Sequence, residues 1–567
     1  MWRLALSAFL LRRHITPYRA FVDTDDAARR WHRWTNADLE EISDPAAIDP
    51  VVDDVLIASF SHPTSPPPWA TFLQEAVDLE IHAPAGTSAG AVVFVSVSDP
   101  DDNEGPRWIA WAFGGGSRTL NRLRLEPRFG LYAALNRLSR HGSDEDGDNE
   151  LAVRLRQLQY RTPSPYSLQT GQRAGRDAPL RGFRLDQLVD LISGVGGRTA
   201  DDDDQVFGAR QLRIRRQVAS INDLVSESAE ALKDAGAQDY LEEFSFVDSM
   251  VAVDDEEEIE SVRAQLLAEL LDEESDRVDV FYPDDLVDLG DERAVTYIAY
   301  RGERRSAHGR TVLTLGMVQA MARDKPDSIL DRPLRFLDAA GDDIGTLPVL
   351  ACLAADIVVD EQRYVVYDGD FFRVDQQFID EIDAAVAGMS MTSLAMPGYQ
   401  SGREDAWNGR LADQYPDSCV LLDKRLIRPT GQTGFEPCDV ISHDGLLVHA
   451  KRKGRSSTLS HLFTQAVRSA ELLTRDPACQ LALFDRINER ASSPDLANRV
   501  IDRFASLRAR PPDLEVCFAL LGPWGTRRQL SLPLLAKMDL VNAFQRLDQL
   551  GLHPTLALVG ADGSLGA

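Results

Sequence analysis

The chain lacks the features of a disulfide-stapled, zinc-binding or membrane-spanning protein. It has only five cysteines in 567 residues, an odd number with no CxxC pair. This spacing excludes a zinc knuckle and a disulfide framework, and free thiols fit a reducing cytoplasm. No apolar run approaches the roughly 18 residues that cross a bilayer, so we expect a cytoplasmic protein without a membrane partner.

Basic residues are outnumbered by acidic ones. Lys and Arg number 61 against 90 Asp and Glu, which gives a net charge of −29. This balance argues against a surface that binds nucleic acid non-specifically. The acidity belongs to the first 400 residues, because residues 401–567 hold 21 Lys and Arg and 19 Asp and Glu. Plain solubility is an equally good account of the overall charge.

Length and hydrophobic patterning indicate a mixed α/β protein, α+β overall, of several domains. We expect an N-terminal mixed α/β domain at 1–200, an acidic middle domain at 201–400 and a third domain at 401–567. The opening stretch is predicted to be a strand rather than a signal peptide. Its short apolar segment ends at Arg12 and Arg13, with no small-residue cleavage site after it.

The third domain has the most regular pattern. Alternating apolar positions predict its strands, and apolar stripes predict its helices. The predicted elements are a helix at 404–415, strands at 418–427, 438–442 and 446–452, a helix at 459–473, a strand at 514–522, a helix at 532–551 and a strand at 555–560. The core order is therefore α-β-β-β-α-β.

One segment of this domain, Glu436–Leu473, reads EPCDVISHDGLLVHAKRKGRSSTLSHLFTQAVRSAELL. Asp439 heads one apolar run, Lys451 ends the next, and Gln465 follows on the helix. With the order of elements, these residues resemble the core of the PD-(D/E)xK nucleases, in particular the Mrr-like restriction branch. The resemblance implies a restriction-endonuclease-like fold, preceded by two mixed α/β domains, and metal-dependent phosphodiester hydrolysis.

The resemblance also implies roles for individual residues. In that superfamily an aspartate begins one strand, an acid-x-lysine triplet lies on the next, and a glutamate of the preceding helix often assists. By position, Asp439 matches the strand aspartate, Lys451 the triplet lysine and Glu404 the helical acid. Gln465 lies where some Mrr-like members place a helical glutamine. The implied cofactor is Mg²⁺ or Mn²⁺, because carboxylate oxygens suit these ions.

The triplet departs from the family pattern at its first position. His449 stands where the superfamily has Glu, Asp or Gln, and it shares a strand face with Lys451. Imidazole is a poor magnesium ligand. Three outcomes follow: an altered metal, an acid supplied elsewhere, such as Glu436 or Asp423, or a site that binds without cutting. A structural alternative is that Asp439 caps a turn and Lys451 is an exposed strand residue.

The catalytic candidates are Asp439, Lys451, His449 and Gln465, and the candidate metal ligands are Asp439, Glu404 and Glu436. A local basic cluster follows the third strand, and we expect it to contact phosphates. Its members are Arg452, Lys453 and Arg455.

The whole chain also resembles a sporadically distributed family of uncharacterised bacterial proteins, a domain of unknown function. The similarity lies in segments such as 111–136, 363–375 and 436–473. Sporadic occurrence implies mobile-element or anti-phage defence. The hypothesis is a nuclease that acts on nucleic acid, DNA rather than RNA. Partner proteins of a defence system and a homo-oligomer are compatible with it. The alternative is a degenerate nuclease fold that binds nucleic acid or protein as a sensor or adaptor.

Two charged motifs remain open to more than one interpretation. Arg122, Arg124 and Arg128, with Arg118, could form a basic ridge along a nucleic-acid backbone, or a face that pairs with acids of the middle domain. The acidic stretch 254–260, DDEEEIE, lacks the glycine and ligand spacing of a calcium loop. It is predicted to be a solvated helix start; mimicry of nucleic acid over a basic cleft is the second interpretation.

Overall fold

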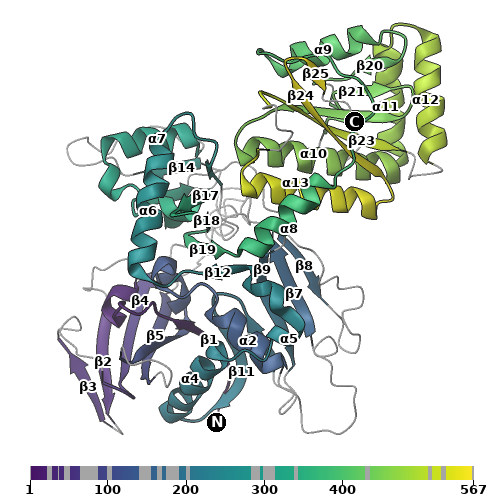
Figure 1. Ribbon diagram of the computed structural model, residues 1–567. Coiled ribbons are helices and arrows are strands. Elements are labelled where there is room, and N and C mark those ends of the chain that lie inside the picture. The colour runs from purple at the N-terminus through teal and green to yellow at the C-terminus, as the bar shows by residue number, and fades with distance from the viewer. Residues whose placement is uncertain are drawn as a thin grey trace, which may run out of the picture.

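The structure is a computed structural model of the 567-residue chain. It describes residues 2–21, 29–35, 38–43, 51–63, 87–98, 105–139, 155–161, 169–173, 191–198, 205–281, 294–297, 313–337, 343–424, 426–427, 434–508, 514–524 and 531–564. These residues form three units that we call the N-terminal (2–249), middle (250–388) and C-terminal (389–564) units (Figure 1).

The N-terminal unit is built on one antiparallel sheet of eleven strands in the order β3-β2-β4-β5-β6-β1-β11-β10-β9-β7-β8. Its strands are β1 (Trp2–Leu10), β2 (Arg29–Thr35), β3 (Asp38–Ile42), β4 (Val55–Pro63), β5 (Thr87–Val97), β6 (Arg107–Gly114), β7 (Leu155–Arg161), β8 (Gln169–Arg173), β9 (Leu191–Arg198), β10 (Gln205–Gly208) and β11 (Leu212–Val218). The predicted opening strand is thus β1, near the middle of the sheet, and the sheet continues past residue 200.

Two helices cover one face of this sheet. The helical elements here are α2 (Phe129–Ser139), α4 (Ile221–Gly236), α5 (Leu241–Phe244), and the 3-10 turns η1 (Pro17–Ala20), η4 (Gly116–Thr119), η5 (Arg122–Arg124) and η6 (Ser245–Ser249). Helix α2 crosses the sheet closely, because Gly130 meets Gly208 with no side chain between them. A Cβ on Gly208 would lie 1.9 Å from the Gly130 carbonyl oxygen. Only glycine permits this approach.

The middle unit contains a five-stranded sheet, β12-β19-β18-β17-β13, and a three-stranded sheet, β14-β15-β16. The strands are β12 (Met250–Ala252), β13 (Val278–Val280), β14 (Ala294–Tyr297), β15 (Pro333–Leu337), β16 (Asp343–Pro348), β17 (Leu353–Val359), β18 (Gln362–Tyr367) and β19 (Asp370–Val374). The helical elements are α6 (Glu256–Leu271), α7 (Leu315–Asp324), α8 (Gln376–Ala387), η8 (Pro326–Ser328) and η9 (Val349–Cys352). The predicted hairpin is β18–β19, whose turn has Asp368 at φ 57° and Gly369 at φ 85°.

The C-terminal unit has a mixed six-stranded sheet in the order β20-β21-β22-β23-β24-β25. Its strands are β20 (Cys419–Leu421), β21 (Val440–Ser442), β22 (Leu446–Arg452), β23 (Glu515–Leu521), β24 (His553–Gly560) and β25 (Gly563–Ser564). Its helices are α9 (Glu404–Gln414), α10 (Ser456–Arg475), α11 (Pro477–Arg490), α12 (Pro494–Arg508) and α13 (Leu534–Gln549). Strands β22, β23 and β24 are parallel, whereas β20, β21 and β22 form an antiparallel meander.

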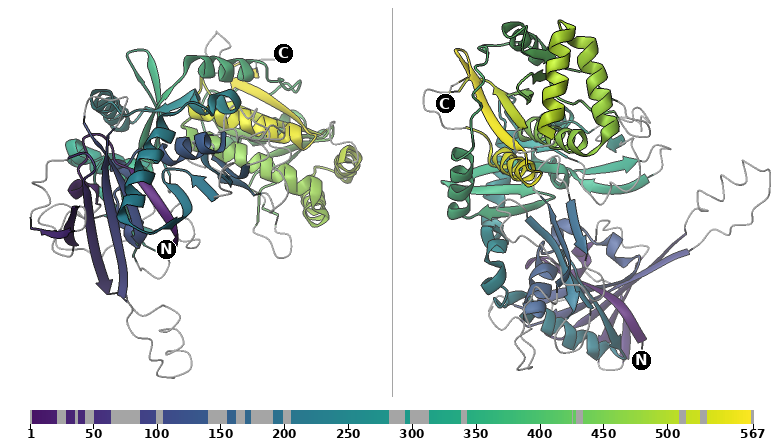
Figure 2. Two further views of the ribbon diagram at one scale, coloured as in Figure 1. Left: turned by 90° about the horizontal axis from the view of Figure 1, so that it is seen from below. Right: turned by 90° about the vertical axis from the view of Figure 1, so that its right-hand side faces the viewer.

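The middle and C-terminal units share helix α13, which lies between their two sheets (Figures 1 and 2). Leu534, Leu535, Met538 and Val541 pack with α8 and the middle sheet. Ala536, Leu540, Ala543 and Leu547 pack on the opposite side with α10 and the C-terminal sheet. The helix is therefore buried on two sides, as expected for a helix with two apolar faces.

Two buried aspartates of the middle unit cap helices of the C-terminal unit. The Asp279 carboxylate accepts a hydrogen bond from the Ser457 amide, 2.7 Å away, in the first turn of α10. The Asp356 carboxylate accepts one from the Leu534 amide, 2.8 Å away, at the start of α13. A negative charge at a helix N-terminus satisfies free amides and complements the helix dipole.

The mixed α/β class is confirmed by this architecture. All five cysteines are free and buried. None of the described helices is both long and apolar enough to cross a membrane.

Candidate metal centre

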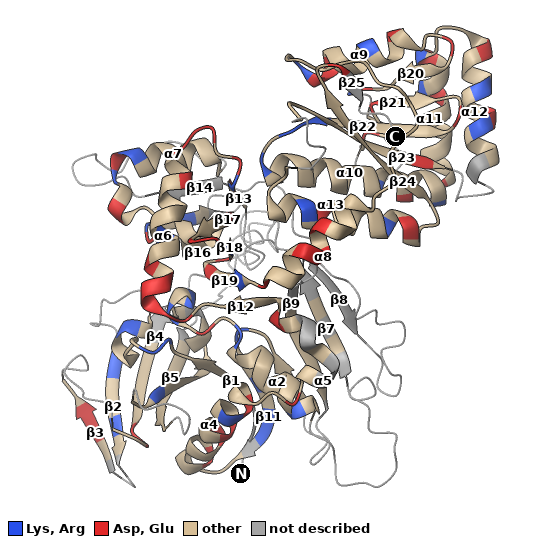
Figure 3. Ribbon diagram, in the orientation of Figure 1, with Lys and Arg blue, Asp and Glu red and all other residues tan. Residues whose placement is uncertain are grey.

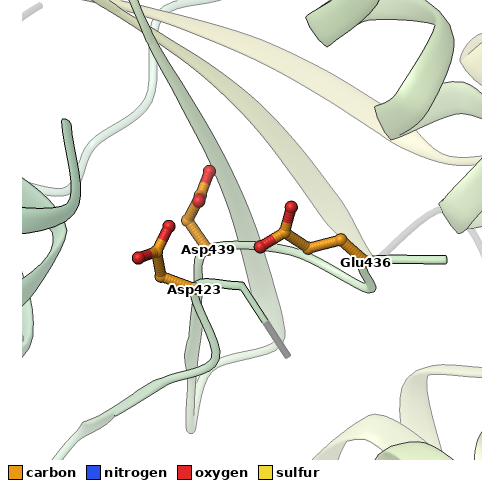
Figure 4. A group of neighbouring side chains, drawn as sticks. All are labelled: Asp423, Glu436 and Asp439. Atoms are coloured by element: carbon orange, nitrogen blue, oxygen red, sulfur yellow. The ribbon is translucent and has the colours of Figure 1, made fainter. Parts of the chain in front are cut away.

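Three carboxylates meet at the start of the C-terminal meander. Asp423, Glu436 and Asp439 each offer an oxygen, and these atoms all lie within 4.8 Å of one another. The three side chains are each partly buried, and Figure 4 shows them gathered around one space. Such a set of oxygens matches the ligands that Mg²⁺, Mn²⁺ and Ca²⁺ prefer.

Backbone geometry explains how the meander brings these acids together. Strand β20 ends at Leu421, so Asp423 lies in the turn after it rather than in the longer strand predicted at 418–427. Asp439 directly precedes β21 and accepts a hydrogen bond from the Ala450 amide of β22, at 2.7 Å. Glu436 accepts a hydrogen bond from the Lys424 amide. Backbone amides thus hold the carboxylates of Asp439 and Glu436.

Asn408 of α9 joins two of the three acids. Its fully buried side chain donates to Asp423, at 3.2 Å, and to Asp439, at 3.0 Å. The side-chain amide oxygen Oδ1 of Asn408 has no hydrogen-bond partner among the described residues. Asn408 is not among the site residues predicted from the sequence. Its spacing of four from Glu404 on a helix was the available signal.

The cluster is electrostatically strained without a cation. Burial raises the pKa of Asp439 well above its usual range, and the neighbouring charges of Glu436 and Asp423 raise it further. The Ala450 amide acts in the opposite direction but does not compensate. A divalent cation between the oxygens would offset the repulsion and favour the ionised forms. The residues present therefore fit a divalent metal.

Lys451 follows Ala450, whose amide contacts Asp439, and its side chain pairs with Glu404. The Lys451 ammonium is 3.2 Å from one Glu404 oxygen, and the Arg452 amide donates to the other at 3.1 Å. Within the described residues, Glu404 is not one of the three grouped acids. Glu404 and Asn408 stand one turn apart on α9, so the same helix holds both the lysine and two of the acids.

His449 lies away from water inside the core. It is 2% exposed, and burial lowers its pKa to about 3, so the ring is neutral. Its Nε2 has no hydrogen-bond partner in the part of the chain that is described. Leu447, two residues earlier on the same strand face, belongs to the core beneath α10. His449 is not a member of the three-acid group found among the described residues.

Gln465 on α10 completes the surroundings of the cluster. Its amide donates to the second Glu436 oxygen at 2.9 Å. The expected phosphate-binding residues differ in exposure and contacts. Arg452 is 61% exposed, Lys453 donates to Ser531 and lies over the Trp524 ring, and Arg455 donates to carbonyl oxygens of Glu273 and Ser275 in the middle unit.

Comparison with known proteins identifies the family. The model of a family of unknown function (DUF6119) matches residues 6–560, and the chain belongs to that family. No curated protein and no solved structure matches the chain.

Proposed function

We propose that the C-terminal unit is a metal-dependent nuclease that hydrolyses phosphodiester bonds of nucleic acid. The observation that carries the proposal is the convergence of Asp423, Glu436 and Asp439 within 4.8 Å. Strand β22, whose Ala450 amide contacts Asp439, carries Lys451 as its last residue but one. A divalent ion held by carboxylates activates a water and neutralises charge on a phosphoryl group. DNA is the substrate we propose, and bacterial anti-phage or mobile-element defence is the setting.

Each neighbouring residue has a role in this proposal. Asp423, Glu436 and Asp439 would hold Mg²⁺ or Mn²⁺, while Asn408 and Gln465 orient their oxygens. Lys451 would stabilise the negative charge that develops on the phosphoryl oxygens, and Glu404 positions its ammonium group. In this arrangement Asp423 and Glu436 would replace the acid that the triplet lacks at position 449.

The order of elements supports a restriction-endonuclease-like core. The chain runs α9-β20-β21-β22-α10, and then reaches β23, α13 and β24 after the inserted helices α11 and α12. The predicted α-β-β-β-α-β order is contained in that sequence. The proposed metal ligands come from the segment between β20 and β21, and the lysine comes from the end of β22.

Cleavage assays test the proposal directly. We expect the full-length protein to cut labelled plasmid or single-stranded DNA with Mg²⁺ or Mn²⁺ and not with chelator. Lys451→Ala should reduce the cleavage rate by about 100-fold or more, because one electrostatic contact to the transition state is lost. Arg475→Ala is the matched control, since it removes an exposed cation of α10 that is 65% accessible. Equal rates in both variants would remove Lys451 from the mechanism.

The alternative function is a degenerate nuclease fold that binds without cutting. The buried, neutral His449 at the triplet's first position favours it, because this residue offers the cluster no acid. In that case nucleic acid, or a protein partner, would bind equally well with metal or chelator. Metal-dependent cleavage that disappears in Asp439→Asn would exclude this alternative.

A further inference from the structure

A large open cleft lies between the N-terminal and middle units, away from the three-acid cluster. Its volume is about 1460 Å³, above the 300–1,000 Å³ that is usual for small-molecule sites. One wall is the N-terminal unit around η5, α2 and β11. The other is the middle unit, with the first turns of α6 and the β18–β19 turn.

The floor of the cleft is an ionic contact between the two units. The Asp370 carboxylate of the middle unit pairs with Arg12 at 3.3 Å and with Arg210 at 2.5 Å. Asp368 pairs with Arg122. These carboxylates neutralise the deepest cations and hold the walls in place.

Other arginines on the N-terminal wall have no such partner. Arg124, Arg128 and Arg213 all line the cleft, and no described carboxylate lies within ion-pairing distance of any of them. Arg124 donates to the Arg19 carbonyl oxygen, and Arg128 donates to the Val247 carbonyl oxygen at 2.7 Å. Because Arg124 is partly desolvated and close to Arg19, its pKa is lowered. Cations in such surroundings gain free energy from an added anion.

The proposed basic ridge is thus partly present in the described residues. Arg122, Arg124 and Arg128 line the cleft, whereas the side chain of Arg118 lies outside the described part. Arg213 on β11 joins them, and its guanidinium is 5.9 Å from the centroid of the Phe207 ring, which also lines the cleft. Arginines beside an aromatic ring are the usual surface for a single nucleic-acid strand.

The acidic stretch faces these arginines from the opposite wall. Glu256, Glu257 and Glu260 at the start of α6 line the same cleft. They stand out as the red first turns of α6 above the N-terminal unit (Figure 3). Glu256 makes a 2.9 Å contact with His14 of the basic wall. Three carboxylates therefore share this cleft with the arginines.

We propose that this cleft is a binding site for single-stranded nucleic acid, partly masked by the acidic start of α6. Arg124 and Arg213 take the phosphates, whereas Arg128 is only 5% exposed and supports the wall from behind. Phe207 offers a stacking surface. Glu256, Glu257 and Glu260 repel the strand and weaken its binding. This site is separate from the metal centre and does not depend on the proposed nuclease activity.

The first experiment removes the mask. Binding of a fluorescein-labelled 15-nucleotide oligo-dT is measured by fluorescence anisotropy in chelator, with the full-length chain. We expect Glu256→Gln, Glu257→Gln, Glu260→Gln combined to bind about tenfold more tightly than wild type, because three repulsive charges are lost. The matched control is a triple Glu→Gln variant at Glu273, Glu274 and Glu381, which belong to the same unit and do not line the cleft. Equal affinities of the two triple variants would overturn the mask.

The second experiment removes the basic wall. Combined Arg124→Ala and Arg213→Ala should weaken oligo-dT binding and reduce the slope of log affinity against log salt by about 1.4, the value for two single-strand phosphates. Arg475→Ala with Arg490→Ala on α10 and α11 is the control. Unchanged affinity and slope would overturn the site. Thermal melting of each variant confirms that it remains folded.

A competition experiment tests the class of ligand. Unlabelled oligo-dT should displace the probe, whereas poly-L-glutamate at equal charge should displace it at least about tenfold less well, because it offers neither bases nor phosphates. Equal displacement would overturn the assignment to nucleic acid and indicate an acidic protein segment. Since all measurements are made in chelator, an inactive metal centre would not affect their outcome.

Discussion

At the scale of single residues, the Asp439 carboxylate lies where a negative charge is unfavourable. Asp439 is held by the Ala450 amide and Asn408, yet burial and the nearby Glu436 and Asp423 keep its pKa high. A residue kept where its charge is unfavourable is more readily explained by function than by stability.

We therefore expect Asp439→Asn to stabilise the metal-free protein, by roughly 0.5–2 kcal/mol at neutral pH. The folded-state pKa lies above the roughly 3.9 of an unfolded aspartate, so the contribution of Asp439 to wild-type stability falls as pH rises above about 4. The difference between variant and wild type should vanish below that pH. Chemical denaturation of both proteins between roughly pH 3.5 and 8, the range of this titration, measures the difference in their free energies of unfolding.

A matched substitution and a metal titration complete this test. Asp444→Asn removes the same charge from a neighbouring residue that is 81% exposed, and it should leave stability unchanged within about 0.5 kcal/mol. Added Mn²⁺ should stabilise wild type by about 2.7 kcal/mol at a hundredfold its Kd and stabilise Asp439→Asn less. A destabilised Asp439→Asn with an unchanged response to Mn²⁺ would contradict the metal centre.

At the scale of elements, the start of α10 depends on a residue of another unit. Asp279→Ala should cost about 0.5–2 kcal/mol, the usual effect of a lost helix cap. It should also speed hydrogen exchange of the amides in the first turn of α10, which hydrogen-exchange mass spectrometry detects. The control is Asp255→Ala, which removes the cap of α6, a 2.7 Å bond to the Glu258 amide. If Asp279→Ala left exchange in α10 unchanged, the cap would be dispensable.

The elements also show what the sequence can predict. Periodicity alone predicted α10 and β22, because their apolar stripe and alternation are undisturbed by the inserted helices. It extended the strand at 418–427 too far, since β20 ends at Leu421 and the chain turns at Asp423. Alternation correctly placed His449 and Lys451 on one face. Alternation could not show that α10 covers His449. Nor could it show that Lys451, near the end of the strand, reaches Glu404.

Asn408 and Asp423 illustrate why a site is harder to predict than its strands. Neither belongs to a recognisable motif, and their roles arise only when α9 and the turn after β20 pack against β22. Contacts between distant segments carry no periodic signal. The resemblance supplied Asp439, Lys451 and Gln465, and the sequence offered Glu436 and Asp423 as alternative acids. The fold groups these three acids and adds Asn408.

At the scale of the whole molecule, the N-terminal and middle units are joined by Asp370. Asp370→Ala should destabilise the protein by about 3–5 kcal/mol, because it leaves the buried charges of Arg12 and Arg210 without a partner. Asp331→Ala breaks an ion pair with Arg263 whose carboxylate is 61% exposed, and it should cost less than about 1 kcal/mol. Thermal and chemical unfolding measure the loss of stability in each variant. Equal losses would show that the buried ion pairs of Asp370 stabilise the protein no more than the exposed pair.

Helix α13 has a consequence for how this protein can be divided. A fragment that begins near residue 400 would keep the helix but lose the sheet on its other side. Leu534, Leu535, Met538 and Val541 would then face water as one continuous apolar strip. Strips of this kind promote self-association and capture by chaperones. Any rearrangement that separates the middle and C-terminal units would therefore yield an aggregation-prone protein. We expect the two units to stay together in one chain during evolution.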